Sequence, residues 1–145
     1  MARPSKAETL HATCVSIDGS GVLIVGPSGS GKSGLALQLM ALGADLVSDD
    51  RTDVTMVSGA LRATAPPTIA GLIEARGVGI LNAPVQSDTA IALIVDMGQA
   101  ETERLPHRRL RTIQGVTLPC LHKVDAAHFA AAVLLYLRRG ISQRS

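Results

Sequence analysis

The segment GPSGSGKS at residues 26–33 matches the pattern GxxxxGK[ST] at every fixed position. The apolar run VLIV precedes it and a leucine-rich stretch follows, so it stands between an expected strand and an expected helix. In that setting the glycines let successive backbone N–H groups curl around an anion, and the helix presents its positive end to it. The segment therefore predicts a cradle for a nucleoside triphosphate, formed by Gly26, Pro27, Ser28, Gly29, Ser30, Gly31, Lys32 and Ser33.

Two side chains of this segment carry the expected chemistry. Lys32 is expected to neutralise the β- and γ-phosphates, and the Ser33 hydroxyl is expected to ligate Mg²⁺. ATP and Mg²⁺ are thus the predicted ligands. The alternative is a Gly/Ser-rich turn that merely joins a strand to a helix, but the complete match and both flanking elements favour the phosphate cradle.

A pair of carboxylates, Asp49-Asp50, ends the next apolar run, ADLV at 44–47. Side chains alternate along a strand, so the two carboxylates would point in opposite directions if the strand continued. One can serve a metal and the other an attacking hydroxyl only if the strand has ended and the backbone turns there. The other interpretation is that both carboxylates solvate a turn beside Arg51.

Three further segments have plain interpretations from their residues alone. IAGLIEAR at 69–76 predicts a short helix, with Arg76 near its negative end and Gly77 as its cap. His11, in a strand with apolar neighbours, is typical of a core or edge histidine. The polar, Arg-rich stretch at 98–114 has no apolar period and predicts a long surface loop, whose length and charge make it a functional candidate.

The amino-acid composition limits the classes of protein to which this chain can belong. With 145 residues, 46% of them hydrophobic, the chain has the size of one domain. Its only aromatic residues are Phe129 and Tyr136, and its net charge is +2, which argues against a dedicated nucleic-acid binder. Cys14 and Cys120 are expected to be small buried hydrophobes. No stretch has the length of a membrane span, so a cytoplasmic protein without a membrane partner is predicted.

Apolar periodicity and turn residues outline the elements. A hairpin is expected from 10–17 and 22–25, and a central strand from the continuous apolar run at 89–97. A helix ending at Gly43 and a last helix at 126–139 are also expected. The predicted organisation is a flexible arm at 1–8, a P-loop kinase domain at 9–140 and a tail at 141–145, and the further strands are expected at 44–50, 52–59, 61–65 and 115–121.

Four segments together resemble one family. LHATCVSIDGSGVLIVG, GPSGSGKS, LALQLMALGADLVSDDRTDV and IEARGVGIL occur in the order found in the catalytic domain of HPr kinase/phosphorylase. The resemblance implies an α/β fold, a single P-loop-containing domain with a mixed sheet, similar to the phosphoenolpyruvate carboxykinase fold. It also implies a short, proteobacterial form without the family's N-terminal domain.

The resemblance assigns catalytic roles to four residues. His11 matches the family histidine near the phosphates, and Lys32 matches the P-loop lysine. Asp50 matches the aspartate that acts as base in phosphorylation and as acid in dephosphorylation. Arg104 corresponds to the arginine placed against the transferring phosphate, with Arg108 as the alternative.

The resemblance also implies a metal site and a protein partner. Ser33, Glu74 and Asp49 are the expected metal ligands, and EARGVGIL is the segment that the family uses in both reactions. The expected activity is phosphorylation of a seryl residue of the phosphocarrier HPr, by a homo-oligomer that is a hexamer in the family. VTLPCLHKVDAAHF lacks the Arg-Asn pair that many members use for dephosphorylation.

Two other functions are compatible with the phosphate cradle. One is a nucleotide-binding regulatory module in which no phosphate is transferred. The other is a kinase for a small metabolite, with the segment from Arg104 to Arg111 as an arginine-rich lid. The same segment could instead dock a protein partner electrostatically.

Overall fold

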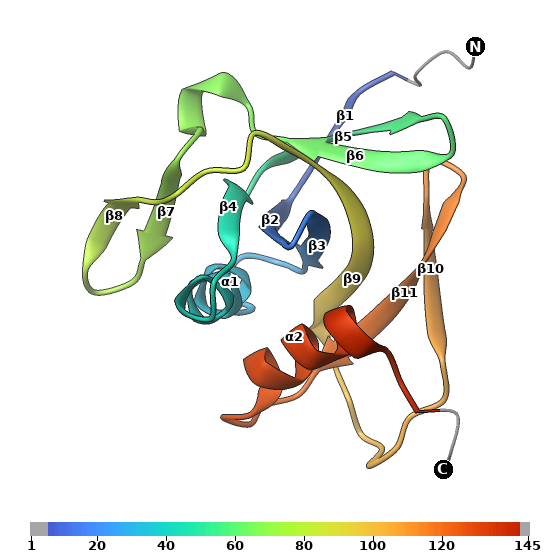
Figure 1. The fold of residues 1–145 in the computed structure, drawn as a ribbon. Coiled ribbons are helices and arrows are strands. Elements are labelled where there is room, and N and C mark those ends of the chain that lie inside the picture. The colour runs from blue at the N-terminus through green and yellow to red at the C-terminus, as the bar shows by residue number, and fades with distance from the viewer. Residues whose placement is uncertain (1–5, 143–145) are drawn as a thin grey trace.

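The strands of the main sheet, in the computed structural model that describes residues 6–142, curl around a long central strand, and two helices complete an α/β fold (Figure 1). The strands are β1 Glu8–Leu10, β2 Ala12–Ile17, β3 Ser20–Val25, β4 Asp45–Ser48, β5 Thr52–Val57, β6 Ala60–Thr64, β9 Asp88–Ala100, β10 Arg109–Ile113 and β11 Val116–Lys123. The helices are α1 Lys32–Ala41 and α2 Phe129–Arg139. The sheet is mixed, because it contains both antiparallel pairs, such as β2–β3, and parallel pairs, such as β3–β9.

The central strand β9 explains the curl of the sheet. One edge of β9 pairs in parallel with β3 along most of its length. Its other edge pairs antiparallel with β6 near Asp88–Ala90 and then in parallel with β11 at Ile94–Asp96. Because two different strands share that edge, the sheet bends at β9. Strands β3, β2 and β4 follow one edge of β9 in that order, and the other edge leads to β6, β5 and β1 at one end and to β11 and β10 at the other.

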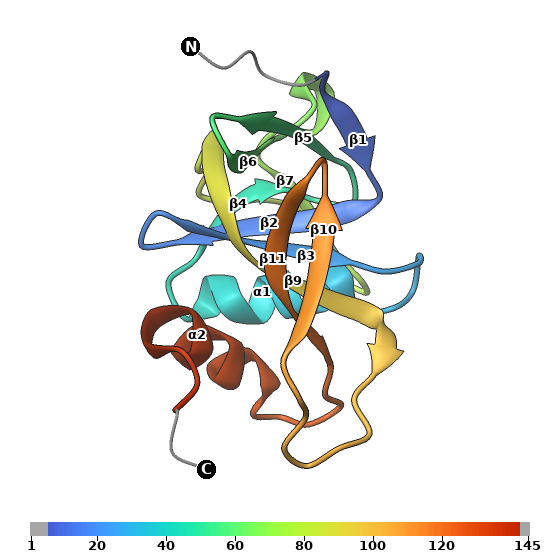
Figure 2. The same cartoon turned by 90° about the vertical axis from the view of Figure 1, so that its right-hand side faces the viewer.

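The core lies on both faces of this sheet. Val22 and Ile24 of β3 pack with α1 and α2, whereas Leu23 and Val25 point into a second cluster between the sheet and the other strands. A strand that is covered on both faces must be apolar at every position, which is why the run at 22–25 shows no alternation. Figure 2 shows both helices below β2 and β3, and the β10–β11 hairpin in front. Neither helix of residues 6–142 is long and apolar enough to cross a membrane.

Most of the elements expected from the sequence are confirmed. The predicted hairpin is formed by β2 and β3, whose register pairs Ala12 with Val25 and Ile17 with Ser20. The predicted strands at 44–50, 52–59 and 115–121 appear as β4, β5 and β11. The arm predicted at 1–8 lies mostly outside the described residues, and Glu8 begins β1. Of the tail predicted at 141–145, residues 143–145 also lie outside them.

The helix predicted at 69–76 is wrong. A 3₁₀ turn occupies Pro67–Ile69, and β7 at Leu72–Ala75 pairs with β8 at Gly79–Asn82 to form a separate hairpin. Along β7 burial alternates, because Ile73 and Ala75 face inward and their neighbours face solvent. Gly71, inside the predicted helix, has a positive φ angle of 78°, which the interior of a right-handed helix does not accommodate. Figure 1 shows this hairpin projecting beyond α1.

The long loop predicted at 98–114 is shorter than expected. Strand β9 continues to Ala100 and β10 begins at Arg109, so only residues 101–108 connect them. Strand β10 pairs only with β11, and an edge strand of this kind can carry outward-facing charged side chains. This is why its Arg-rich sequence shows no apolar period. The last helix likewise begins at Phe129, three residues after the predicted start.

Removal of a buried leucine tests this description of the core. Leu39 of α1 is fully buried, whereas Leu135 of α2 is 63% exposed. Leu39→Ala should lower the free energy of unfolding by about 2–5 kcal/mol, because it removes buried methyl groups and leaves a cavity. Leu135→Ala makes the same change in a helix and should cost less than about 1 kcal/mol. Urea denaturation measures both, and equal losses would contradict the assigned core.

Candidate functional site

The loop between β3 and α1 follows a tight course that only glycine permits at two points. Gly26 has a φ of 143°, and a Cβ there would lie 2.7 Å from Ser30 Oγ and 3.0 Å from the Gly98 nitrogen. Gly31 has a φ of 99° and precedes the first residue of α1. The loop therefore wraps closely in front of the helix N-terminus, where backbone N–H groups are available to an anion.

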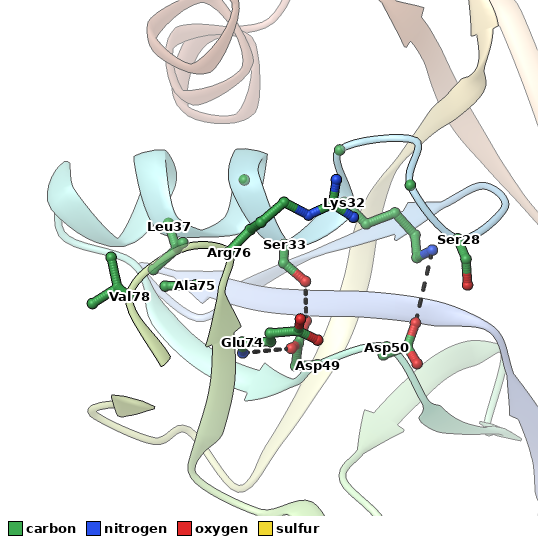
Figure 3. Close-up of a pocket in the computed structure, with 13 residues that line it drawn as sticks. Ser28, Lys32, Ser33, Leu37, Asp49, Asp50, Glu74, Ala75, Arg76 and Val78 are labelled. Carbon is green, nitrogen blue, oxygen red and sulfur yellow. Dashed lines mark hydrogen bonds and ion pairs between the residues drawn. The ribbon is translucent and has the colours of Figure 1, made fainter. Parts of the chain in front are cut away.

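A cavity of about 680 Å³ opens beside this loop, and Figure 3 shows the side chains around it. This volume is suited to a small-molecule ligand. The cavity is lined by residues from the phosphate loop, from α1, from the carboxylate pair and from the β7–β8 hairpin: Ser28, Gly29, Gly31, Lys32, Ser33, Gly34, Leu37, Asp49, Asp50, Glu74, Ala75, Arg76 and Val78. Segments distant in sequence thus meet at one opening.

Lys32 folds back over the loop that precedes it. Its Nζ donates to the carbonyl oxygens of Gly26 at 2.9 Å and Pro27 at 3.1 Å, and its side chain is 5% exposed. The same ammonium lies 3.8 Å from Asp50 Oδ1. Its positive charge is therefore fixed between the loop and the open side of the cavity, where it can attract an anionic ligand.

A sharp turn separates the two adjacent carboxylates. The N–H of Arg51 donates to the carbonyl of Asp49 at 2.8 Å, and Asp50 between them has a φ of 67°. These are the features of a γ-turn, which is uncommon with a positive central φ and costs backbone strain. The strand has therefore ended before the two carboxylates, which is the condition under which one could serve a metal and the other an attacking hydroxyl. Both carboxylates line the same cavity.

Asp49 is buried and bound by donors from three elements. Its Oδ1 accepts from Thr13 Oγ1 of β2 at 3.0 Å and from Ser33 Oγ of α1 at 2.6 Å, and its Oδ2 accepts from the Glu74 N–H of β7 at 3.0 Å. Carboxylate and hydroxyl oxygens are the ligands that Mg²⁺ prefers. Because Ser33 donates its hydrogen to Asp49, its lone pairs stay available to a cation, so Ser33, Asp49 and the Glu74 carboxylate fit the predicted metal site.

Asp50, in contrast, is half exposed and pairs with His11. His11 Nε2 lies 2.7 Å from Asp50 Oδ1, and the two side chains are 49% and 55% exposed. Ser28 Oγ lies 3.5 Å from the same ring nitrogen. Of the two environments expected for His11, core or edge, the core is excluded, because the residue lies between β1 and β2 and faces solvent at the rim of the phosphate loop. The arrangement leaves the Asp50 carboxylate open to an approaching group.

Glu74 and Arg76 reach the cavity from the β7–β8 hairpin. Alternation along β7 sends Ile73 inward and leaves the Glu74 side chain exposed to the cavity, while its N–H secures Asp49. Arg76 therefore does not cap a helix end but lies at the turn of a hairpin. Among residues 6–142, no three His, Cys, Asp or Glu side chains are already clustered as a metal site. A cation there would take part of its coordination from the ligand phosphates.

Arg104 is not brought to this cavity. It lies exposed in the connection at 101–108, and it is not among the lining residues. Arg108, the alternative, borders a much smaller cavity beside α2. The connection is anchored by Arg109, whose Nε and Nη2 donate to the two carboxylate oxygens of Glu101 at 3.1 and 3.0 Å.

Sequence reasoning missed Thr13. Its fully buried hydroxyl donates to Asp49 and also accepts the N–H of Asp50 at 3.0 Å, so it holds both carboxylates of the turn. A hydroxyl within the largely apolar run of β2 was the available signal, because such a group must find partners when buried. Burial raises the pKa of the Cys14 and Cys120 thiols, and neither lines the cavity, which agrees with their predicted role as buried hydrophobes.

Known proteins resemble this chain along most of its length. The family model described as "HPr Serine kinase C-terminal domain" matches residues 3–122. The "HPr kinase/phosphorylase" of Stenotrophomonas maltophilia (strain K279a) is 41% identical over 106 residues, which are 68% of this chain and 34% of that protein. That of Clostridium novyi (strain NT) is 44% identical over 75 residues, 52% of this chain and 24% of that protein. The chain thus spans about a quarter to a third of these relatives.

A solved structure shares the fold. The "Structure of the Hpr(Ser) kinase/phosphatase from Coxiella burnetii" superposes with a TM-score of 0.76 and 27% sequence identity. The alignment covers 90% of this chain and 94% of that chain. The similarity therefore extends over most of the fold.

Replacement of Thr13 tests the link between the two carboxylates. Thr13→Val keeps the shape of the side chain but leaves Asp49 short of a donor and the Asp50 N–H short of its acceptor. The expected loss is about 1–3 kcal/mol in the free energy of unfolding. Thr13→Ser keeps the hydroxyl and is the matched control. Chemical denaturation that found the two variants equally stable would contradict the proposed role of the hydroxyl.

The anchor of the 101–108 connection predicts a dependence on pH. The hydrogen bond from Arg109 lowers the pKa of Glu101 from 4.5 to about 2. The folded state thus keeps Glu101 ionised where the unfolded chain protonates it, so the stabilisation is complete above about pH 4.5 and is lost as the pH falls toward 2.

Glu101→Gln should therefore remove this part of the acid dependence. The wild type should exceed the variant in unfolding free energy at neutral pH, and the difference should shrink between pH 5 and pH 2. Glu103→Gln, in the same connection, is the control and should keep the wild-type profile. Denaturation curves across this range measure the effect, and a difference that is independent of pH would contradict it.

Proposed function

The chain belongs to the family of HPr Serine kinase C-terminal domains, and we propose that it is an ATP-dependent kinase that phosphorylates a seryl residue of the phosphocarrier HPr. The observation that carries the proposal is the pairing of a phosphate loop with two carboxylates of different exposure in one cavity. Phosphoryl transfer needs a polyanion held in place and a group that accepts a proton from the attacking hydroxyl. The phosphate loop would hold the polyanion, and a carboxylate would accept the proton.

The side of the cavity next to the phosphate loop would hold the triphosphate. Backbone N–H groups of residues 26–33 would face the phosphate oxygens, and Lys32 would exchange its carbonyl partners for the β- and γ-phosphates. Ser33, Asp49 and Glu74 would hold Mg²⁺. When bound, Mg²⁺ offsets the charge of the β- and γ-phosphate oxygens.

The exposed rim of the cavity, at Asp50 and His11, would receive the serine. Asp50 would accept the proton of the serine hydroxyl while that oxygen forms a bond to the γ-phosphorus and the bond to the leaving ADP oxygen breaks. His11, at 2.7 Å, would keep the Asp50 carboxylate turned toward the nucleophile. Since Asp50 is 55% exposed, a hydroxyl on the surface of a folded protein can reach it.

The segment from Arg104 to Arg111 would supply a docking surface for a protein substrate. It carries four arginines and continues into the exposed edge strand β10. A contact of this kind would act mainly on encounter and orientation. For Arg104 itself to offset charge on the transferred phosphate, the 101–108 connection would have to fold toward the cavity. Assembly into a homo-oligomer, as the resemblance implies, is part of the same proposal.

Substitution of Asp50 tests the proposed base. Asn tolerates the positive φ of this position, so Asp50→Asn should fold while losing phosphoryl transfer by at least about 100-fold. Nucleotide affinity should stay within a few-fold of the wild type. Asp18→Asn makes the same change at another residue with positive φ, in the β2–β3 turn, and should be fully active. The measurements are transfer of label from γ-labelled ATP to HPr and calorimetric binding of ADP.

Several outcomes would change the proposal. Near-normal phosphorylation by Asp50→Asn would show that the base is a different group. ATP binding without transfer to HPr would favour the regulatory module, and label on a small molecule would favour a metabolite kinase. The same assay with inorganic phosphate added to phosphorylated HPr would measure the reverse reaction, for which the segment VTLPCLHKVDAAHF lacks the family's Arg-Asn pair.

A further inference from the structure

Lys123 reaches the phosphate loop from the opposite end of the chain. It is the last residue of β11, and the register between β11 and β9 shifts between His122 and Lys123. The Lys123 carbonyl accepts the N–H of Glu101 at 2.8 Å, which fixes the backbone after the shift. Irregularities of this kind redirect a side chain and are frequent next to active sites.

The redirected side chain binds the backbone of the loop. Lys123 Nζ donates to the Ser30 carbonyl oxygen at 3.1 Å, and a Cβ built on Gly31 would lie 3.9 Å from the same nitrogen. Lys32 meanwhile donates to the Gly26 and Pro27 carbonyls. Carbonyl oxygens of the loop are thus held by two lysines, one within the loop and one 93 residues away.

This contact also fixes the direction of a neighbouring N–H. In a planar trans peptide the C=O and the following N–H point in opposite directions. When Lys123 holds the Ser30 carbonyl, the Gly31 N–H must therefore point away from Lys123. Gly31 lines the cavity, and its φ of 99° lets the chain turn into α1 immediately afterwards.

We propose that Lys123 is a positioning residue for triphosphate binding, which holds the Ser30–Gly31 peptide so that the Gly31 N–H faces the phosphates. Its ammonium also adds a second positive charge beside the loop, in addition to that of Lys32. This inference rests on the proposed nucleotide site, and it assigns a role to a residue that does not belong to the GxxxxGK[ST] pattern.

Lys123→Met tests the inference, because methionine keeps an unbranched side chain and removes the charge and the donor. Loss of a charged hydrogen bond and of a nearby cation should weaken binding of ATP, and of inorganic tripolyphosphate, by about 10-fold. In the transfer assay KM for ATP should rise by a similar factor with little change in kcat. This is expected when a variant weakens binding of the ground state and of the transition state equally. Lys123→Arg should restore most of the affinity.

Arg138→Met is the matched control. It removes a cation of α2 that pairs with Asp18 at the β2–β3 turn, and it should leave ATP affinity unchanged. The thermal unfolding midpoint without ligand separates positioning from a structural role. Affinity of Lys123→Met within two-fold of the wild type would overturn the inference, and so would a loss that merely follows a lower unfolding midpoint. If the wild type itself binds no triphosphate, the proposed function fails first.

A second measurement uses the unmodified protein and does not depend on the folding of a variant. Coupling between two binding events is reciprocal, so if the Lys123 contact favours triphosphate binding, bound triphosphate must favour that contact. The chain has three lysines, Lys6, Lys32 and Lys123, so acetylation can be followed at each by mass spectrometry. ATP should slow the labelling of Lys123 several-fold and leave exposed Lys6 unchanged. Equal rates at Lys123 with and without ATP would overturn the inference.

Discussion

A buried carboxylate must find hydrogen-bond donors, and Asp49 finds three, each from a different element of the fold. Thr13 comes from the hairpin that leads to the phosphate loop, Ser33 from the helix that follows the loop, and the Glu74 N–H from the separate β7–β8 hairpin. One side chain therefore ties together three elements that the core also packs against one another. If Asp49 were uncharged or displaced, the cavity walls would lose their common attachment, and the hydroxyl of Ser33 would lose its orientation.

The γ-turn at Asp50 gives two neighbouring residues different environments. Asp49 turns inward, where it is 8% exposed, and Asp50 turns outward beside His11 and Lys32. A continued strand would have placed the two carboxylates on opposite faces of the sheet, and only one of them could then have entered the cavity. The strain of a positive φ at a residue other than glycine is compensated by the contacts of Thr13, which binds the Asp49 side chain and the Asp50 N–H.

Local patterns predicted the parts of the molecule that depend on local physics. The glycine spacing of the phosphate loop, the β2–β3 turn and the apolar run of β9 each carry their own signal. The β7–β8 hairpin was missed because Ile, Leu and Ala at 69–75 are compatible with either period, and the positive φ of Gly71 excludes a helix through this segment. The metal-site assignment of Glu74 came only from the family resemblance. The contacts of Thr13 and Lys123 could not be predicted, because each joins residues at least 36 positions apart.

The distribution of exposure across the cavity bears on the kind of nucleophile that the proposed reaction would use. Lys32, which would face the phosphates, and Asp49, which would hold Mg²⁺, are buried, and their positions are fixed by hydrogen bonds to backbone and side chains. Asp50 and His11, which would face the nucleophile, are about half exposed and lie at the rim. A metabolite kinase needs to enclose its second substrate to exclude water from the transfer. A protein substrate can cover an open rim with its own surface, so the exposed base is more consistent with a seryl hydroxyl on a folded partner than with a small alcohol.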